Sequence, residues 1–335
     1  MPPLRSWRRC AAADGAGARE RPGGPRPSRF LRGGGAGAIA RLLFLTRDVR
    51  LYSMRRLHEA CRRQGHQFRA MDVLQAHLVL RPGSAELWEA GERVLPTDLD
   101  AVVPRIGTTV TTQGCAVVNQ FEMMGVPVVN TSSAILRARD KLRSLQHLAR
   151  AGVPIPRTSL VTDPEDLDEA VAEVGGLPCV VKLLQGTQGI GVMLLESREA
   201  LESVLQAFWS LGHTVLLQEF VAESRGRDVR AFLVGGEVVA AMRRQAHGKE
   251  FRSNIHRGGT GMPVELTEAQ KEACVAAASA MGLEVAGVDF LEASDGAKVI
   301  EVNASPGFEG LEQATRADVA GAIVRYAAAR GGARP

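Results

Sequence analysis

The sequence predicts an α/β fold, in which an N-terminal domain with a parallel sheet is followed by two α+β subdomains. Strand-like apolar runs alternate with helix-like segments between residues 41 and 130, which is typical of a parallel sheet. Later strand-like runs are joined by short glycine-containing turns, as antiparallel hairpins are. The composition, with 45% hydrophobic and 23% charged residues, is that of an ordinary globular protein. We expect a leader at 1–40, the parallel domain at 41–130, and subdomains at 131–214 and 215–330.

The net charge of +4 is unevenly distributed along the 335 residues. Residues 1–40 hold eight arginines against two acidic residues, a net +6, which leaves −2 for the rest of the chain. This leader is rich in Gly, Pro and Ala and poor in large apolar side chains, so we expect it to be disordered. It lacks the apolar core of a secretory signal, and the absence of an amphipathic period favours a solvated tail over an organellar transit peptide.

Composition also bounds the partners and the location. The sequence has no run of about 18 apolar residues, which predicts no membrane partner. The five cysteines lack C-x-x-C spacing, which fits a reducing compartment, so a cytoplasmic location is expected. Because the basic pI comes from the leader and the body is slightly acidic, the sequence indicates that no direct nucleic-acid partner is required. The oligomeric state stays open, a homo-oligomer included.

The first domain is predicted from its apolar runs and from the glycines that end its helices. Gly65 and Gly125 each follow a helix-like segment, and Pro104 closes an apolar run. No G-x-G-x-x-G follows the first strand, so the dinucleotide-binding fingerprint is absent and a dehydrogenase is set aside. The expected elements are a strand at 42–45, a helix at 53–64, a strand at 101–103, a helix at 111–124 and a third strand at 126–129.

The later part of the chain carries clear helix starts. We expect one charged helix over 133–151, a helix capped by Asp163 ahead of Pro164, and a helix that starts with a capping box at 267–270 and runs to Met281. The expected strands are 179–184, 214–218, 229–234, 237–242, 285–291 and 298–302, with a hairpin turn at 235–236 and an antiparallel pair around 295–296.

Lys182 is the first chemical anomaly of the sequence. It stands inside an apolar strand, so its ammonium must reach solvent on one face or pair with an anion. The glycine-rich segment 186–191 follows directly, and such a turn can bring backbone N–H groups close to phosphate oxygens. The segment is not a P-loop, because Val192 stands where that motif needs lysine. The alternative is a lysine on an edge strand followed by a hairpin.

Two carboxylates and an amide form a candidate metal site. Glu301 and Asn303 are two residues apart on one expected strand, so they share a face, and Asp289 lies on the neighbouring strand. These oxygen ligands suit Mg²⁺ that also binds substrate phosphates. The alternative is a solvated polar face of the sheet.

Basic residues are concentrated near the middle of the second half. Arginine clamps carboxylate or phosphate in a bidentate manner, and the shortage of aromatic residues argues against RNA stacking, so the cluster suits small anions. The alternative is a solvated charged face. The cluster consists of Arg227, Arg230, Arg243, Arg244, Arg252, His256 and Arg257.

Taken in order, several phrases of the sequence resemble the RimK type of glutamate ligase within the ATP-grasp superfamily. In that family the enzyme adds glutamate to the C-terminus of ribosomal protein S6 and can extend it as a polyglutamate tail. The resemblance runs from about residue 41 to about 328, and residues 1–40 have no counterpart. It is carried by Pro104-Arg105-Ile106-Gly107, Ala138-Arg139-Asp140-Lys141-Leu142, Val180-Val181-Lys182-Leu183, the glycine segment through Val192, Phe251-Arg252-Ser253-Asn254, His256-Arg257-Gly258-Gly259 and Val302-Asn303-Ala304-Ser305-Pro306-Gly307.

The resemblance implies two subdomains that clasp ATP, and it implies a role for each matching residue. Asp289, Glu301 and Asn303 would hold two Mg²⁺ ions, or Mn²⁺ in their place. Arg230 and Arg244, with Lys182, would act on the transferring phosphate or the acceptor carboxylate, although Gln245 stands where some relatives have a further arginine. The implied ATP-binding residues are Lys141, Lys182, Gly186, Gln188, Gly189, Gly191, Glu219, Phe220, Asp228, Arg252, Ser253 and Asn254.

The resemblance further implies an ATP-dependent, ADP-forming ligase that joins L-glutamate to the C-terminal carboxylate of ribosomal protein S6, repeatedly, through an acylphosphate. Two alternatives stay open. One is an ATP-grasp ligase for another acceptor, such as a carrier protein, a cofactor polyglutamate or a small acidic peptide. The other is a non-catalytic RNA- or ribosome-binding protein that uses the Arg-rich leader.

Overall fold

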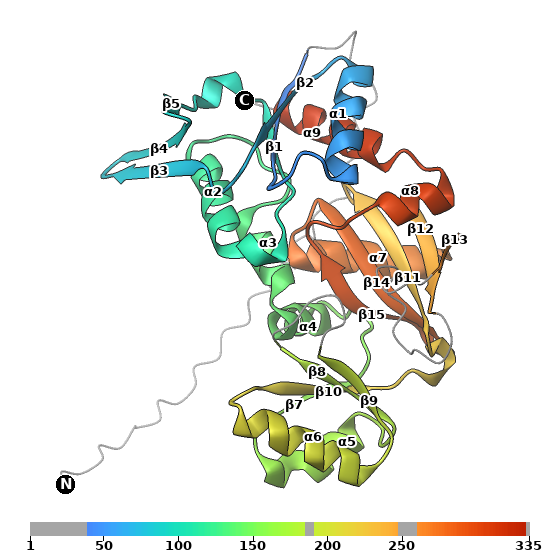
Figure 1. Ribbon diagram of the computed structural model, residues 1–335. Helices are drawn as coiled ribbons and strands as arrows, with labels where there is room; N and C mark the ends of the chain where they lie inside the picture. Colours follow the sequence, from blue (N-terminus) through green and yellow to red (C-terminus); the bar gives the residue numbers. More distant parts are fainter. Residues whose placement is uncertain (1–38, 185–190, 247–259, 333–335) are drawn as a thin grey trace, which may run out of the picture. The chain divides into compact units, whose positions relative to one another are not determined.

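The computed structural model describes residues 39–184, 191–246 and 260–332 (Figure 1). Its first domain is built on a parallel sheet of order β2-β1-β6, which confirms the predicted parallel arrangement. A helix follows β1 and another follows β6, and the first of them ends at Gly65 in the left-handed conformation, as expected. The elements are β1 (Arg41–Leu45), α1 (Tyr52–Gln64), β2 (Gln67–Met71), β6 (Ala101–Pro104), η2 (Thr108–Val110) and α2 (Thr111–Met123).

The third strand of this sheet is β2 and not the predicted segment 126–129. Within that segment only Val128 forms a bridge, opposite Val102 of β6. Pro104 ends β6 and has no N–H, so the ladder of backbone hydrogen bonds cannot continue. Polar residues at alternate positions of β2 left no apolar run for the sequence analysis to recognise.

A second, antiparallel sheet of order β3-β4-β5 was not predicted. Its first two strands form a hairpin in which Leu78 lies opposite Leu87. Figure 1 shows this hairpin extending away from α2. The elements are β3 (Ala76–Arg81), β4 (Ser84–Glu89), β5 (Glu92–Arg93) and η1 (Pro96–Asp98).

The charged segment predicted as one helix over 133–151 forms two, α3 (Ser132–Arg139) and α4 (Lys141–Arg150). Asp140 has an extended backbone, with φ −89° and ψ 107°, and its carboxylate accepts a hydrogen bond of 2.9 Å from the Arg143 N–H. Asp140 is therefore the N-cap of α4. This break makes Lys141 the first residue of α4.

The next part of the chain forms an antiparallel sheet of order β7-β10-β8-β9, with α5 and α6 on one face (Figure 1). It has a hydrophobic core of its own, in which Leu167, Leu201 and Leu217 are buried. Asp163 caps the helical segment through the Glu165 N–H at 2.9 Å, as predicted. The elements are β7 (Thr158–Val161), η3 (Pro164–Asp166), α5 (Leu167–Glu173), β8 (Cys179–Leu183), β9 (Val192–Leu195), α6 (Arg198–Ser210) and β10 (Val215–Glu219).

The last part forms an antiparallel sheet of order β13-β12-β11-β14-β15. The predicted hairpin joins β11 to β12, the pair around 295–296 joins β14 to β15, and the capping box of Thr267 and Gln270 starts α7. The elements are η4 (Ala222–Ser224), β11 (Arg227–Val234), β12 (Glu237–Gln245), β13 (Thr260–Pro263), α7 (Glu268–Met281), β14 (Val285–Ala293), β15 (Gly296–Asn303), α8 (Glu309–Thr315) and α9 (Val319–Gly332).

Packing joins the first domain to the five-stranded sheet. Phe121 and Phe290 belong to one buried cluster, and Phe44 and Phe232 belong to another, so both clusters combine the two parts. The buried Asn130 adds polar contacts, because its amide donates to the carbonyls of Val285 and Ala304 at 2.7 and 3.0 Å. In the described parts of the chain, the helices are too short or too polar to cross a membrane.

Candidate active site

Charged side chains converge on one face of the five-stranded sheet. The register places Asp228 of β11 opposite Arg244 of β12, and Arg230 of β11 opposite Asp289 of β14. Asp289 in turn lies opposite Glu301 of β15. Since residues two apart on a strand share a face, the strand pairing alone brings these five side chains together.

Arg230 and Arg244 bind carboxylates of the same sheet face. Arg230 donates to both oxygens of Asp289, at 2.7 and 2.6 Å. Arg244 donates from Nε to Asp228 at 2.6 Å and from Nη2 to Asp289 at 2.9 Å, with a further contact from Nη2 to Asp228. Asp228, Arg244 and Asp289 are 5% exposed or less, so the ion pairs form an almost fully buried network.

The two carboxylates of the predicted metal site differ in their surroundings. Burial by itself would raise the pKa of Asp289, but Arg230 and Arg244 outweigh it and hold the pKa below its usual value. For Glu301, burial among neighbouring groups and the charge of Asp289 raise the pKa. The Glu301 side chain still reaches solvent, and no hydrogen bond to its carboxylate is found among the described residues. A carboxylate in this position is stabilised by a bound cation.

The donor set at this point of the sheet fits a hard divalent cation. Asp289 uses three of its four lone-pair sites on the two arginines, which leaves one on Oδ1, and Glu301 offers both oxygens. Asn303 is the last residue of β15, two residues after Glu301, and its buried amide nitrogen has no hydrogen-bond partner among the described residues. Three or more His, Cys, Asp or Glu side chains do not gather as a metal cluster anywhere in the described ranges, so a metal here depends on the Asn303 amide oxygen.

Lys182 and Lys141 approach the same site from the four-stranded sheet and from α4. Lys182 stands on β8, which lies between β10 and β9, so the alternative of an edge strand is excluded. Burial lowers the pKa of Lys182 to about 8, although the charge of Glu301 opposes this shift. Lys141 donates from Nζ to the Leu183 carbonyl at 2.7 Å, and its pKa is also lowered by burial.

Gly191 is the residue of the glycine segment that the structure describes, and it ends this segment at β9. Its φ of 76° favours glycine, and a Cβ there would lie 2.9 Å from Leu183 Cδ1. The Gly191 carbonyl accepts from the Leu183 N–H at 2.8 Å. The other predicted ATP-binding residues of the two loops, Gly186, Gln188, Gly189, Arg252, Ser253 and Asn254, lie outside the described residues.

Glu219 and Phe220 lie where β10 ends. The Glu219 carboxylate accepts from Lys298 Nζ at 2.8 Å and from the Arg157 N–H at 3.0 Å, so it links β10 to β15. The centre of the Phe220 ring lies 5.8 Å from Cζ of Arg225. Glu219 therefore acts as a connection between the two sheets in this structure.

The basic cluster is only partly brought together. Arg230 and Arg244 point into the site. Arg243, the residue before Arg244, faces away from it and donates from two nitrogens to the Glu292 carboxylate, each at 2.8 Å. Arg227 donates to the Glu223 carbonyl. Arg252, His256 and Arg257 lie outside the described residues.

Two further arginines near the site had no role in the sequence analysis, although both stand in the phrases that carried the resemblance. Arg139 donates to the Ile106 carbonyl at 2.6 Å. Burial lowers the pKa of Arg139, and the nearby charge of Glu301 opposes this shift. Arg105 donates to the Pro306 carbonyl at 2.6 Å. The signal that could have identified them is a charge directly after an apolar strand and a second charge ahead of a helix cap.

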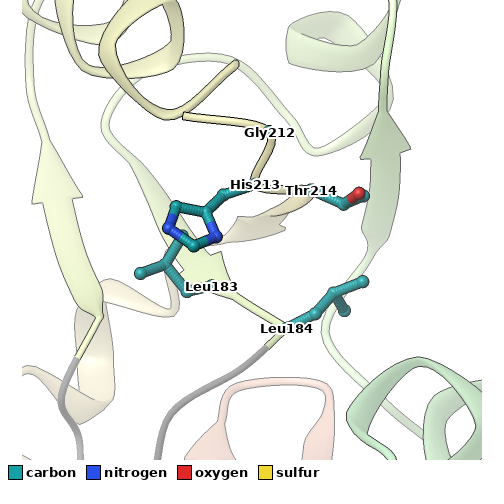
Figure 2. Close-up of a pocket in the computed structure, with 5 residues that line it drawn as sticks. All are labelled: Leu183, Leu184, Gly212, His213 and Thr214. Carbon is teal, nitrogen blue, oxygen red and sulfur yellow. The ribbon is translucent and has the colours of Figure 1, made fainter. Parts of the chain in front are cut away.

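A small pocket of about 90 Å³ lies beyond the end of β8 (Figure 2). It is lined by Leu183, Leu184, Gly212, His213 and Thr214. Figure 2 shows His213 beside Leu183, on the turn that leads into β10. Ligand sites for molecules of nucleotide size have roughly 300 Å³ or more, so this pocket is too small to hold ATP.

Comparison with known proteins shows the family. Residues 40–135 match the RimK PreATP-grasp domain and residues 138–327 match the RimK-like ATP-grasp domain. A probable alpha-L-glutamate ligase of Thioalkalivibrio sulfidiphilus is 52% identical over 286 residues, which cover 85% of this chain and 94% of the relative. A probable alpha-L-glutamate ligase of Pseudoalteromonas translucida is 50% identical over 282 residues, which cover 84% of this chain and 93% of the relative.

Solved structures support the same fold. The ATP-grasp ligase PsnB complexed with a minimal precursor has a TM-score of 0.70 at 24% identity, over 87% of this chain and 99% of that chain. PsnB complexed with minimal precursor, Mg and ADP has a TM-score of 0.67 at 23% identity, over 87% of this chain and 98% of that chain. The chain thus belongs to the RimK family of ATP-grasp ligases, and the predicted fold and class of enzyme, an ADP-forming carboxylate–amine ligase, are confirmed.

Proposed function

We propose that this protein adds L-glutamate to the C-terminal carboxylate of ribosomal protein S6, repeatedly, with cleavage of ATP to ADP and phosphate. The observation that carries the proposal is the meeting of Lys182, Lys141 and the Arg230–Asp289–Arg244 network beside Glu301. The names of the relatives, alpha-L-glutamate ligases, support glutamate as the added amino acid and the α-carboxylate as the acceptor. Each product again ends in a carboxylate, so the same site can act again.

The reaction follows from the chemistry of the carboxylate. A carboxylate oxygen attacks the γ-phosphorus of ATP, the bond from that phosphorus to the bridging oxygen breaks, and an acylphosphate and ADP form. The glutamate amine then attacks the acyl carbon, loses a proton and expels phosphate. We assign Lys141, Lys182 and Arg230 to neutralise charge on the transferring phosphate, since phosphoryl transfer depends on positioning and electrostatics. Mg²⁺, or Mn²⁺ in its place, held by Asp289, Glu301 and Asn303 would supply Lewis-acid stabilisation of the phosphate oxygens.

We also propose that the protein is cytoplasmic and that its domains span residues 41–130, 131–214 and 215–330. The ATP contacts of Gly191, Glu219, Phe220 and Asp228 belong to the same proposal. Asp228 is bound by Arg244, so we assign it to the support of that arginine beside the nucleotide.

The proposed function is tested by incubating the protein with ATP, Mg²⁺, L-glutamate and ribosomal protein S6. We expect the intact mass of the acceptor to increase by successive glutamyl residues, with one ADP released for each. If the mass of ribosomal protein S6 stayed unchanged while glutamate was transferred to another acceptor, S6 would be excluded as the acceptor, but the glutamate ligase reaction would stand. Release of AMP would reject the acylphosphate route.

Lys182 gives the reaction a pH dependence. Its ammonium is charged below its pKa of about 8, so we expect kcat/KM for ATP to fall as the pH rises above about 8. Lys182→Arg stays charged there and should lose this alkaline decline, whereas Lys182→Met should lower kcat/KM by about 10²- to 10³-fold at neutral pH. A pH profile of Lys182→Arg that matches the wild-type profile would exclude Lys182 as the titrating group.

A further inference from the structure

Arg105 is a partly buried cation that has no carboxylate partner among the described residues. Its guanidinium donates to the Pro306 carbonyl at 2.6 Å and lies 5.6 Å from the centre of the Phe308 ring. It forms no ion pair with a carboxylate in the described part of the chain, and burial lowers its pKa to about 10. A buried charge with so little compensation is costly unless an anion binds to it.

Unpartnered donor groups are found on this arginine and in the segment that it contacts at Pro306. Arg105 Nε, Asn303 Nδ2 and Ser305 Oγ are each buried without a hydrogen-bond partner among the described residues. Asn303, Ser305 and Pro306 follow one another at the end of β15, and Pro306 packs so tightly on β14 that a Cβ at Gly287 would lie 2.8 Å from its Cβ. Arg105 therefore contacts the residue that directly follows Ser305, in the segment that continues from Asn303. A guanidinium, an amide and a hydroxyl with unused hydrogens match the oxygens of a carboxylate.

Arg105, Asn303 and Ser305 are each partly exposed as whole residues, although these individual atoms are covered. Arg105 Nη1 is not among the covered atoms and has no protein partner in the described ranges, so it reaches solvent. Arg230 and Arg244 already bind the carboxylates of Asp228 and Asp289, whereas Arg139 donates to the Ile106 carbonyl and to the Thr111 hydroxyl.

We propose that Arg105 and Ser305 bind a carboxylate of the incoming L-glutamate. The proposal rests on the proposed function. The acceptor carboxylate loses its charge when the acylphosphate forms, whereas the incoming glutamate reacts through its amine and keeps both carboxylates. A permanent cation at Pro306, in the loop that follows the candidate metal site, suits the molecule whose negative charge persists through the reaction.

The test compares two nucleophiles in Arg105→Gln. Hydroxylamine carries no carboxylate and converts an acylphosphate to a hydroxamate with release of phosphate, so it reports the first step without the Arg105 site. We expect the KM for glutamate to rise roughly 10- to 100-fold, while hydroxamate formation and the KM for ATP stay within about two-fold of wild type. Arg137→Gln is the matched control, because Arg137 is another partly buried arginine that donates to a backbone carbonyl, that of Met281 at 3.1 Å.

The outcomes separate this inference from the proposed function. If the wild type forms neither hydroxamate nor glutamyl product with ribosomal protein S6, the proposed function fails first. If the wild type is active and folded Arg105→Gln keeps its KM for glutamate, or loses the hydroxylamine reaction equally, the inference is overturned. Ser305→Ala, a smaller change, should raise the KM for glutamate by about three- to ten-fold, and it decides the question if Arg105→Gln does not fold.

Discussion

Glu301→Gln is expected to abolish ligation, with a loss of at least about 10³-fold, and to leave the fold intact. Glu301 lies opposite Asp289, and burial together with that neighbour raises its pKa. The ionised carboxylate therefore weakens the folded protein at neutral pH when no cation is bound, and the neutral amide removes this cost. We expect Glu301→Gln to unfold at the same or a higher temperature than the wild type in the absence of Mg²⁺.

Addition of Mg²⁺ separates the two proteins further. A cation that binds the folded state raises the melting temperature of the wild type, and this increase should be lost in Glu301→Gln. Glu292→Gln is the matched control, because Glu292 is on the same sheet but binds Arg243, which faces away from the candidate site. It should keep its activity and its response to Mg²⁺. Near-normal turnover by a folded Glu301→Gln protein would contradict the metal assignment.

Arg244→Met is expected to lower the free energy of unfolding by about 3–5 kcal/mol. Arg244 is 3% exposed and binds two buried carboxylates, those of Asp228 and Asp289. Loss of its charge leaves Asp228 without the ion pair that the structure gives it. Urea unfolding of the purified variant measures the change.

Arg230→Met should cost less, because Asp289 then still binds Arg244 and the Arg230 side chain is 17% exposed. The double variant Arg244→Met/Asp228→Asn should recover part of the lost stability, since it removes the carboxylate charge that Arg244→Met leaves uncompensated, whereas Asp289 keeps Arg230. If Arg244→Met and Arg230→Met lowered the free energy of unfolding equally, the burial of each arginine would not decide how much it stabilises the protein.

The sequence was sufficient where the signal was local. The strands that hold Arg230, Asp289 and Glu301 were expected from apolar runs and short turns, and the i, i+2 rule placed Glu301 beside Asn303. Strand β2 was missed, because its polar alternate positions hide the apolar period. The helix break at Asp140 was also missed, because a cap inside a charged run resembles any other exposed acid.

The ion-pair partner of each charged side chain could not be predicted from the sequence. Arg230 and Arg244 were expected to meet substrate anions, and the structure shows them bound to carboxylates of the same sheet. Arg105 comes from another domain and meets Pro306 across 201 positions of sequence, a contact that no local pattern encodes. Tertiary packing therefore decides which cations are neutralised and which stay available.

The separate core of the four-stranded sheet has a consequence for how this part is attached to the rest of the described chain. The chain enters this part beside Pro154, whose carbonyl accepts from the Val299 N–H at 2.8 Å, and leaves it after Glu219, which binds Lys298. Both connections thus lie at neighbouring positions of β15 and form a two-stranded pivot. The buried residues of each hydrophobic cluster lie on one side of this pivot, so we expect a rotation about it to keep all three clusters intact and to expose little apolar surface.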